Sequence, residues 1–467
     1  MFKLGSMELE SRMVNFLVKA GRDSFRSPKP DPSRVLVYDL LREVNRNGGY
    51  SNLLLPSALS ASSLDQRDKG FVTELLYGTL RMQGRHDYIL SQASDRPWTE
   101  VDSGIVDIAR MGAHQLFEMR VPIHAAVSAT VELARKAIGE SKASFVNALL
   151  RKISQKTLDE WMAPVSLISD PVTRLSISHS HPEWIVSAYF DLLRDFDEVE
   201  KALAANNFPA RPTLVSWPGK SSRDDLLELG AIATQYSPYG ATFDGAPGTL
   251  EIVRHRKAGV QDEGSQIVAD IFAQAAQGKV KWLDLCAGPG GKAALLSSLA
   301  QAGNATFTAN EISEVRSHLV RQVVGGARVW IADGRNIADQ GETFDAILAD
   351  VPCTGLGALR RRPEVRWRRS ISDLRELTLL QRELARAALS VLDVGGIFGY
   401  ATCSPHFAET RIAVADILKE HPEMEMISLE SYLPQNLTGA LDKGALALWT
   451  HRHGTDSMFL AIMRKTS

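Results

Sequence analysis

After residue 260 the sequence alternates between strand-like and helix-like segments, and this alternation limits the possible folds more than any other feature. Apolar runs typical of strands occupy 280–285, 305–309, 328–331, 344–349, 396–402 and 458–463. Helical spacing of apolar residues fills most of the intervals, most clearly over 374–392, where Gly395 and Gly396 are expected to end the helix. Repeated βα units predict a doubly wound, mostly parallel α/β sheet that binds ligands at the carboxyl ends of its strands.

The rest of the chain divides into segments with different patterns. Between the Pro-rich N-terminal stretch and residue 160, apolar residues keep helical spacing throughout, which predicts an all-helical domain. The next segment mixes helix signals with two short strand-like runs, 213–217 and 250–253. A chain of 467 residues is too long for one ordinary core. We therefore divide it into a leader or tether (1–32), a helical domain (33–160), a small α+β connector (165–260) and the sheet domain (261–467).

Composition excludes several classes of protein. The formal net charge of −2 argues against binding of polyanions over the whole surface, so a nucleic-acid partner would have to meet a local basic patch. Three cysteines are too few for a disulfide framework and suit a reducing compartment. The sequence has no run of about 18 apolar residues and no apolar signal core. We therefore expect a cytoplasmic protein that does not enter a membrane.

Two of the three cysteines follow predicted strands directly, at the edge where such a sheet binds ligands. Cys353 ends the loop that begins at Asp350, after the strand-like run 344–349. Cys403 directly follows Thr402, the last residue of the next strand-like run, and a predicted helix lies between the two runs. A lone thiol is most often a buried structural residue. The loop positions and the flanking proline, serine and acid favour a chemical role for both thiols.

A glycine-rich loop with the sequence DLCAGPGGK follows the first predicted strand of the sheet domain. Glycines let a backbone approach a ligand closely, and the helix after the loop offers free N–H groups. The loop is not a Walker phosphate loop, because Cys286 and Ala293 replace required residues. Gly288, Gly290 and Ala293 do fit a dinucleotide fingerprint, with Glu311 about 20 residues further on. From these residues alone, a nicotinamide enzyme remains an alternative.

Three acidic residues follow predicted strands, where they could accept hydrogen bonds from a bound cofactor. Glu311 suits a ribose diol, with a solvated carboxylate at a helix start as the alternative. Asp333 suits an adenine amino group, although Asp333 and Gly334 could also form a plain turn. Asp350 is the third. Lys292, at the start of a helix, is expected to hold substrate or to lower the pKa of a thiol, with an exposed surface lysine as the alternative.

A basic run, RRRPEVRWRR, occupies 360–369 just beyond Cys353. Arginines suit phosphate contacts and an interleaved tryptophan suits base stacking. A charged run is more often a solvated face, but its place beside the cysteine loop favours RNA binding. The residues expected to bind RNA are Arg360, Arg361, Arg362, Arg366 and Trp367.

In this order the glycine loop, Glu311, Asp333 and the two cysteine loops resemble the S-adenosylmethionine-dependent RNA 5-methylcytosine methyltransferases of the Nop/Sun family. The segment QDEGSQ before the first strand is similar to that family's entry motif. ELLYGTLR at 74–81 and VNALLR at 146–151 resemble the NusB-type domain of its bacterial RsmB (Sun/Fmu) branch. The resemblance covers roughly residues 33–465.

The resemblance implies a NusB-like RNA-binding domain and a Rossmann-like class I methyltransferase domain, with S-adenosylmethionine as the cofactor and no metal. It implies small-subunit ribosomal RNA as the substrate, with the target cytosine accessible or flipped out of its stack. The same chemistry on transfer RNA and a non-catalytic ribosomal RNA assembly factor remain alternatives. We expect a monomer. The residues expected to hold the cofactor are Cys286, Ala287, Gly288, Pro289, Gly290, Gly291, Lys292, Glu311, Asp333 and Asp350.

The same resemblance assigns the chemistry to three residues. Cys403 is the nucleophile that adds to carbon 6 of the cytosine, so that carbon 5 can attack a methyl group. Cys353 then takes the carbon 5 proton, which lets the enzyme thiol leave. Asp350 protonates the ring at nitrogen 3 or donates a hydrogen bond to it, which stabilises charge as it develops.

Overall fold

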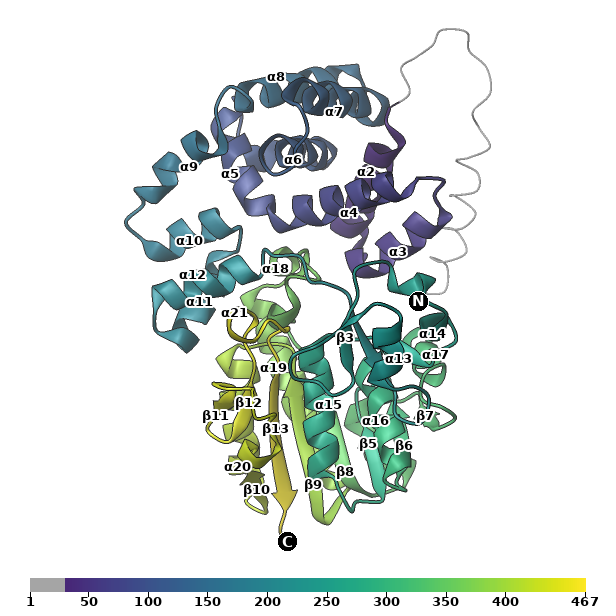
Figure 1. The fold of residues 1–467 in the computed structure, drawn as a ribbon. Coiled ribbons are helices and arrows are strands. Elements are labelled where there is room, and N and C mark those ends of the chain that lie inside the picture. Colours follow the sequence, from purple (N-terminus) through teal and green to yellow (C-terminus); the bar gives the residue numbers. More distant parts are fainter. Residues whose placement is uncertain (1–29) are drawn as a thin grey trace.

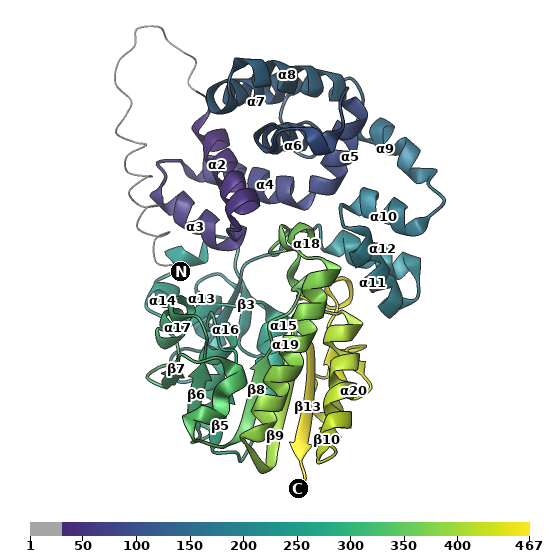
Figure 2. The same ribbon diagram turned by 180° about the vertical axis from the view of Figure 1, so that it is seen from behind.

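The computed structural model describes residues 30–467, which form a helical region packed onto a mixed α/β domain (Figure 1). Most of the predicted tether lies outside the described residues, which start just before helix α2 (Pro32–Asn47). The short helix α18 (Val365–Arg368) belongs to the α/β domain by sequence. It lies at the junction with the helical region in both views (Figures 1 and 2).

The helical region has one main apolar core, to which its first seven described α-helices contribute. In α2 the residues Val37, Leu40, Leu41 and Val44 are buried, as their spacing predicts, and Gly48 ends the helix with a φ of 74°. Helices continue as far as residue 205, so strands are confined to the second half of the predicted connector. The helices after α2 are α3 (Ser51–Ala61), α4 (Gln66–Arg81), α5 (Gln83–Ala93), α6 (Ser103–Phe117), α7 (Ile123–Ile138), α8 (Glu140–Ile153), α9 (Leu158–Ser166), α10 (Pro171–His179), α11 (Glu183–Leu193) and α12 (Phe196–Ala205).

A four-stranded sheet with the order β2-β3-β1-β4 follows the helices. Strand β1 coincides with the predicted run 213–217, but the predicted strand at 250–253 is wrong. That segment is helix α14 (Glu251–Arg254), in which the Arg254 amide donates to the Leu250 carbonyl at 3.0 Å. Short apolar runs fit either structure, and here the backbone closes a turn. The strands are β1 (Thr213–Ser216), β2 (Ile232–Ala233), β3 (Gly240–Thr242) and β4 (Ala258–Val260).

The C-terminal domain is built on a nine-stranded sheet in which β5 to β9 run parallel, and all six predicted strands are confirmed. The last one, β13, lies antiparallel beside β9, and three very short strands around it were not predicted. The strands are β5 (Lys281–Asp284), β6 (Thr306–Asn310), β7 (Arg328–Trp330), β8 (Phe344–Asp350), β9 (Leu392–Thr402), β10 (Met424–Ile427), β11 (Leu441–Asp442), β12 (Ala445–Ala447) and β13 (Phe459–Lys465).

Helices cover both faces of this sheet, as the βα alternation predicts. Helices α15 (Glu263–Ala275) and α16 (Gly291–Ala302) pack on the face seen in Figure 1, and α19 (Ile371–Ser390) and α20 (Arg411–Glu420) on the face seen in Figure 2. The strand order β9-β8-β5-β6-β7 reverses direction beside β5. Such a reversal opens a crevice at the carboxyl ends of the strands, where doubly wound folds bind ligands.

The predicted end of the long helix is wrong. Helix α19 ends at Ser390, and Gly395 and Gly396 lie inside β9. Gly395 has a φ of 77°, and the pairing of β9 with β8 shifts register near Phe344. Gly395 therefore allows an irregularity in β9 and does not end a helix. Among residues 30–467, no helix is long and apolar enough to cross a membrane.

Candidate functional site

A cleft of about 520 Å³ lies at the carboxyl ends of β5, β6, β8 and β9. It brings together all the residues predicted to be catalytic and all but one of those predicted to hold the cofactor. The exception is Gly290, whose φ of 115° caps α16 outside the lining of the cleft. No group of three or more His, Cys, Asp or Glu side chains within the described part of the chain could hold a metal ion.

Glu311 organises the glycine loop from the end of β6. Its buried carboxylate accepts hydrogen bonds from the Gly288 amide at 3.0 Å, the Ser313 amide at 2.8 Å and the Arg316 guanidinium at 2.6 Å. A Cβ atom at Gly288 would lie 2.0 Å from a carboxylate oxygen of Glu311, so only glycine fits there. Oε1 accepts two of these bonds, whereas Oε2 accepts one and keeps accepting capacity for a ligand in the cleft.

Asp333 forms the turn weighed from the sequence and also lies at the cleft. Its carboxylate accepts from the Arg335 amide at 3.0 Å and pairs with the Arg335 guanidinium at 2.6 Å, so it does shape a turn. Asp333 is also half-buried and lines the cleft. The Arg335 contact is the largest cause that lowers the pKa of Asp333, which keeps this acceptor ionised.

A buried acid that the sequence analysis did not select lies at the end of β5. Burial, and then the charge of Asp350, raise the pKa of Asp284 to about 7. One oxygen of Asp284 accepts from the Cys286 amide at 3.3 Å, and the other is buried without a partner. Its position at the carboxyl end of a strand, like that of Asp350, was the available signal. An unpartnered buried acceptor beside a cleft is typical of a ligand contact.

Lys292 and Asp350 form an ion pair on the floor of the cleft, with 2.8 Å between Nζ and Oδ2. Although burial opposes the charge of Lys292, the ion pair with Asp350 raises the pKa of the ammonium. The surface-lysine alternative is therefore wrong. Lys292 holds Asp350 in place and adds positive charge near Cys403, whose pKa it lowers.

The two cysteine loops bring their thiols together, with 3.3 Å between the Sγ atoms of Cys353 and Cys403. The hydrogen bond from Cys353 lowers the pKa of Cys403, and the charges of Arg362 and Lys292 act in the same direction against burial. The same contact, together with burial, raises the pKa of Cys353 well above its ordinary value. Cys403 is therefore the more acidic of the two thiols and Cys353 the less acidic one.

The third cysteine has a different environment. Cys286 lines the cleft but lies among Asp284, Asp350 and Glu311. Burial and these three acids raise its pKa well above the ordinary value, so Cys286 stays a neutral thiol. This environment suits a packing contact with a ligand and not a nucleophile.

A buried network that the sequence analysis missed holds both cysteine loops. The carboxylate of Glu409 accepts from the amide and hydroxyl of Thr354 and, at 3.0 Å, from the Gln381 amide group. The Thr354 hydroxyl also lies 3.1 Å from the Ser404 hydroxyl, which joins the residues that follow the two thiols. Tyr400 completes the network with a hydrogen bond to Gln381 at 3.1 Å.

The basic run contains residues with two separate roles. Arg366 is fully buried and donates to the carbonyls of Ser180 and Arg81, at 3.0 and 3.2 Å, and to Asn207 at 2.9 Å. The prediction that Arg366 contacts RNA is therefore wrong, because its donors bind the helical region. Arg360 is likewise occupied, since it pairs with the buried Asp262 and Asp456 at 2.8 and 3.0 Å.

Arg361 and Arg362 differ from these two, because both line the cleft. Arg361 pairs with the buried Asp456, and its side chain remains 37% exposed. Trp367 does not line the cleft, and its ring packs against Gly84 of α5. The part of the predicted RNA surface that faces the cleft is thus limited to Arg361 and Arg362.

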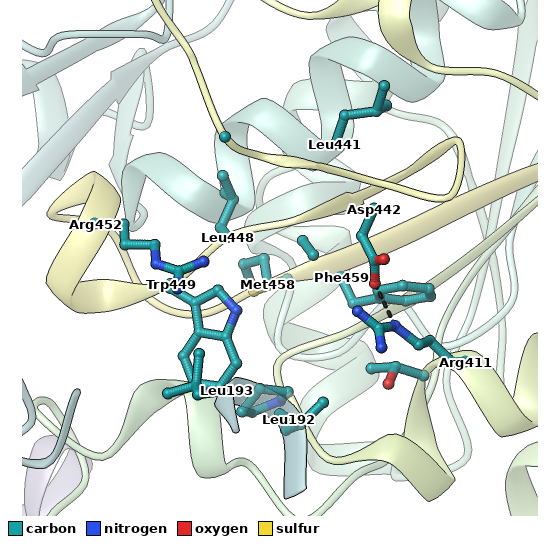
Figure 3. A pocket seen from close by; sticks show the side chains of 14 residues that line it. Leu192, Leu193, Arg411, Leu441, Asp442, Leu448, Trp449, Arg452, Met458 and Phe459 are labelled. Carbon is teal, nitrogen blue, oxygen red and sulfur yellow. Dashed lines mark hydrogen bonds and ion pairs between the residues drawn. The ribbon is translucent and has the colours of Figure 1, made fainter. Parts of the chain in front are cut away.

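A second, smaller cavity of about 200 Å³ lies between the loop after Cys403 and β12 and β13. Figure 3 shows Arg411 and Asp442 paired at its wall, with Trp449 and Phe459 among the apolar side chains around it. None of the predicted site residues lines this cavity.

Comparisons with known proteins point to one group of methyltransferases. Residues 272–464 match the family described as 16S rRNA methyltransferase RsmB/F, and residues 31–155 match the NusB family. A putative methyltransferase of Mycobacterium tuberculosis is 41% identical and the match covers 93% of this chain and 97% of that protein. The probable ribosomal RNA small subunit methyltransferase B of Bacillus subtilis is 30% identical, with 92% and 98% covered.

Two solved structures share the fold. The crystal structure of PH0851 has a TM-score of 0.77 at 20% identity and covers 94% of this chain and 100% of that chain. The crystal structure of NSun6 from Pyrococcus horikoshii with SFG has a TM-score of 0.54 at 18% identity, with 61% and 98% covered. The predicted fold class, a helical NusB-like domain before a class I methyltransferase domain, is confirmed.

Proposed function

Because this chain belongs to the RsmB/F family of methyltransferases, we propose that it methylates carbon 5 of a cytosine in small-subunit ribosomal RNA. Both the family and its cofactor, S-adenosylmethionine, are those that the motifs predict. The observation that carries the proposal is the pair of thiols 3.3 Å apart, with opposite pKa shifts, at the ends of two neighbouring strands. Ribosomal RNA is the substrate named in the Bacillus subtilis relative.

The residues of the cleft fit the cofactor, which supplies an electrophilic methyl group when it is bound. Its sulfonium and ammonium are cationic, and the carboxylates of Asp284, Glu311 and Asp350 line one end of the cleft. Asp284 offers an acceptor oxygen without a protein partner. Because Gly288 has no Cβ, the glycine loop can pack directly against the Glu311 carboxylate. Asp333 offers a carboxylate at the end of β7 for the adenosine portion.

The thiols divide the reaction between them. The Cys403 thiolate forms a bond to carbon 6 of the cytosine, and the electron pair displaced towards carbon 5 allows that carbon to take the methyl group. Asp350, held by Lys292, stabilises the ring at nitrogen 3 during this step. Cys353, which first gives up its own proton to solvent in the open cleft, then accepts the carbon 5 proton. The electron pair of that carbon–hydrogen bond restores the aromatic ring, and Cys403 leaves carbon 6 as a thiolate.

The raised pKa of Cys353 is compatible with its role as a base. Its largest cause is the hydrogen bond to Cys403, followed by burial and by the charge on Cys403. Once Cys403 is bonded to carbon 6, it carries no charge and accepts no hydrogen bond from Cys353. The pKa of Cys353 then falls at the stage at which the proton has to be removed.

The RNA would reach the thiols along the side of the cleft lined by Arg361 and Arg362. Two guanidinium groups can neutralise phosphates next to the target nucleotide. The helical domain, which matches the NusB family, would bind a further part of the same RNA. The target cytosine has to leave its stack, because both thiols lie inside the cleft.

Bisulfite sequencing of RNA from a strain that lacks the gene tests the proposal. We expect one cytosine of small-subunit ribosomal RNA to resist conversion in the parent strain and to be converted in the deletion strain. Return of the protein should restore the resistance, and return of Cys403→Ala should not. A difference confined to transfer RNA would contradict the substrate, and no difference in any RNA would contradict the chemistry.

A further inference from the structure

Side chains near the end of the basic run bind the loop between α2 and α3 of the helical region at the edge of the cleft. Arg368 donates to the carbonyls of Val44 and Gly48, at 2.6 and 3.1 Å. Glu364, which is buried, accepts from the amide of Ser51 at 3.0 Å and from its hydroxyl at 2.8 Å. The loop between α2 and α3 is therefore held from both sides by side chains that follow the Cys353 loop.

Tyr50 lies between these two anchors and is the one described residue of the helical region that lines the cleft. It lines it together with Cys353 and Cys403. Its side chain is 40% exposed, although hydrogen bonds hold the segment on both sides of it. The guanidinium of Arg368 lies over one face of its ring, 5.3 Å from the centroid, in a cation–π contact.

We propose that Tyr50 is a stacking platform for a nucleobase of the substrate RNA next to the target cytosine. The inference rests on the proposed function and adds a contact from the helical domain to the RNA. Exposed aromatic rings stack on unpaired bases, and every base offers such a face. Arg362 and Arg369 line the same cleft and supply cations for the phosphates on either side of the stacked base.

This assignment gives a role to the part of the basic run that does not touch the cleft. Arg368 and Glu364 are positioning residues, because they act on the RNA only through Tyr50 and its loop. A target base withdrawn from its stack leaves its neighbour without a stacking partner, and a fixed aromatic ring replaces that partner. The helical domain thereby helps to hold the RNA with its target base out of the stack.

RNA binding by the full chain tests the inference, with single-stranded RNA oligonucleotides that carry the small-subunit target segment found by bisulfite sequencing. Tyr50→Ala should weaken binding by about fivefold or more, and Tyr50→Phe should bind like the parent. The salt dependence of binding should keep its slope in Tyr50→Ala, because stacking releases no counterions. Leu53→Ala is the matched control, since Leu53 is 64% exposed on the same segment and does not line the cleft.

A photoreactive phenylalanine analogue gives a second readout that a purely structural role would not produce. Placed at position 50 it should cross-link to the RNA, and placed at position 53 it should not. Equal affinity of Tyr50→Ala and the parent, or no cross-link from position 50, would overturn the inference while leaving the proposed function intact. A parent protein that bound none of these RNAs would overturn both.

Discussion

The two cysteine loops and the basic run border the same cleft, but different forces hold them in place. Cys353 and Cys403 follow β8 and β9, which pair in parallel up to Asp350 and Ala401. Backbone hydrogen bonds between the strands therefore bring the two loops side by side. The buried carboxylate of Glu409 then holds the Cys353 loop in place by accepting from the Thr354 amide.

The basic run, by contrast, contains no strand, and its side chains determine its position. Arg360 binds Asp262 and Asp456, whereas Arg366 and Arg368 bind carbonyls of the helical region. These arginines bind residues of other parts of the protein, and only the remaining ones can contact a substrate. The difference teaches that the role of a charged side chain follows from where its partners lie, whereas a residue at the end of a strand is placed by the fold itself.

The largest effect should come from removing a connection between the domains. Arg366→Ala leaves several buried carbonyl acceptors without a donor, and we expect it to lower the free energy of unfolding by about 3 kcal/mol or more. Arg362→Ala, from the cleft-facing part of the same run, should change it by about 1 kcal/mol or less. Urea denaturation measures both values. Equal effects would remove the distinction between connecting and cleft-facing arginines.

The next effect tests the region that the backbone organises. Gly288→Ala should weaken S-adenosylmethionine binding by about tenfold or more, because its Cβ would lie 2.0 Å from Glu311. Gly303→Ala is the control, since its Cβ would meet nothing closer than the Leu299 carbonyl at 3.5 Å and Gly303 does not line the cleft. Calorimetry with the cofactor compares the two variants. If Gly303→Ala were the weaker binder, the close approach at Gly288 would not be what the loop requires.

The sequence predicts the strand ends and the residues on them, because apolar runs of this length form strands and parallel strands end at one edge. It therefore places Cys353, Cys403 and Asp350 at one edge of the sheet, whereas the ion pair of Lys292 with Asp350 is found only in the structure. The sequence does not predict Glu409, because its partner Thr354 lies 55 positions away and no local pattern connects them. The prediction that Arg366 contacts RNA was wrong for the same reason, because its hydrogen-bond acceptors belong to other domains.

A smaller effect concerns the arginines that remain at the cleft. Arg362→Ala should reduce the slope of RNA affinity against salt concentration by about 0.7, the value of one phosphate contact on a single strand. Arg464→Ala removes an exposed arginine that does not line the cleft and should leave the slope unchanged. Filter binding at several salt concentrations compares the two. A slope unaffected by Arg362→Ala would make this residue structural as well.

The smallest expected effect is a shift in the pH profile of a thiol. Because its pKa is lowered, Cys403 should react with iodoacetamide with a midpoint below the ordinary thiol value of about 8.5. Cys353→Ala removes the hydrogen bond that is the largest cause of the shift, so the midpoint should move to higher pH. Peptide mass spectrometry across pH measures both midpoints. A downward movement would mean that Cys353 does not donate to Cys403.

The covalent adduct with RNA tests the central claim, the division of labour between the two thiols, most directly. Cys353→Ala keeps the nucleophile and loses the release step, so a protein–RNA species should accumulate that survives denaturing electrophoresis and requires S-adenosylmethionine. Cys403→Ala and the Cys353→Ala/Cys403→Ala double variant should form none. An adduct in Cys403→Ala would reverse the two roles, and no adduct in any variant would contradict the covalent mechanism.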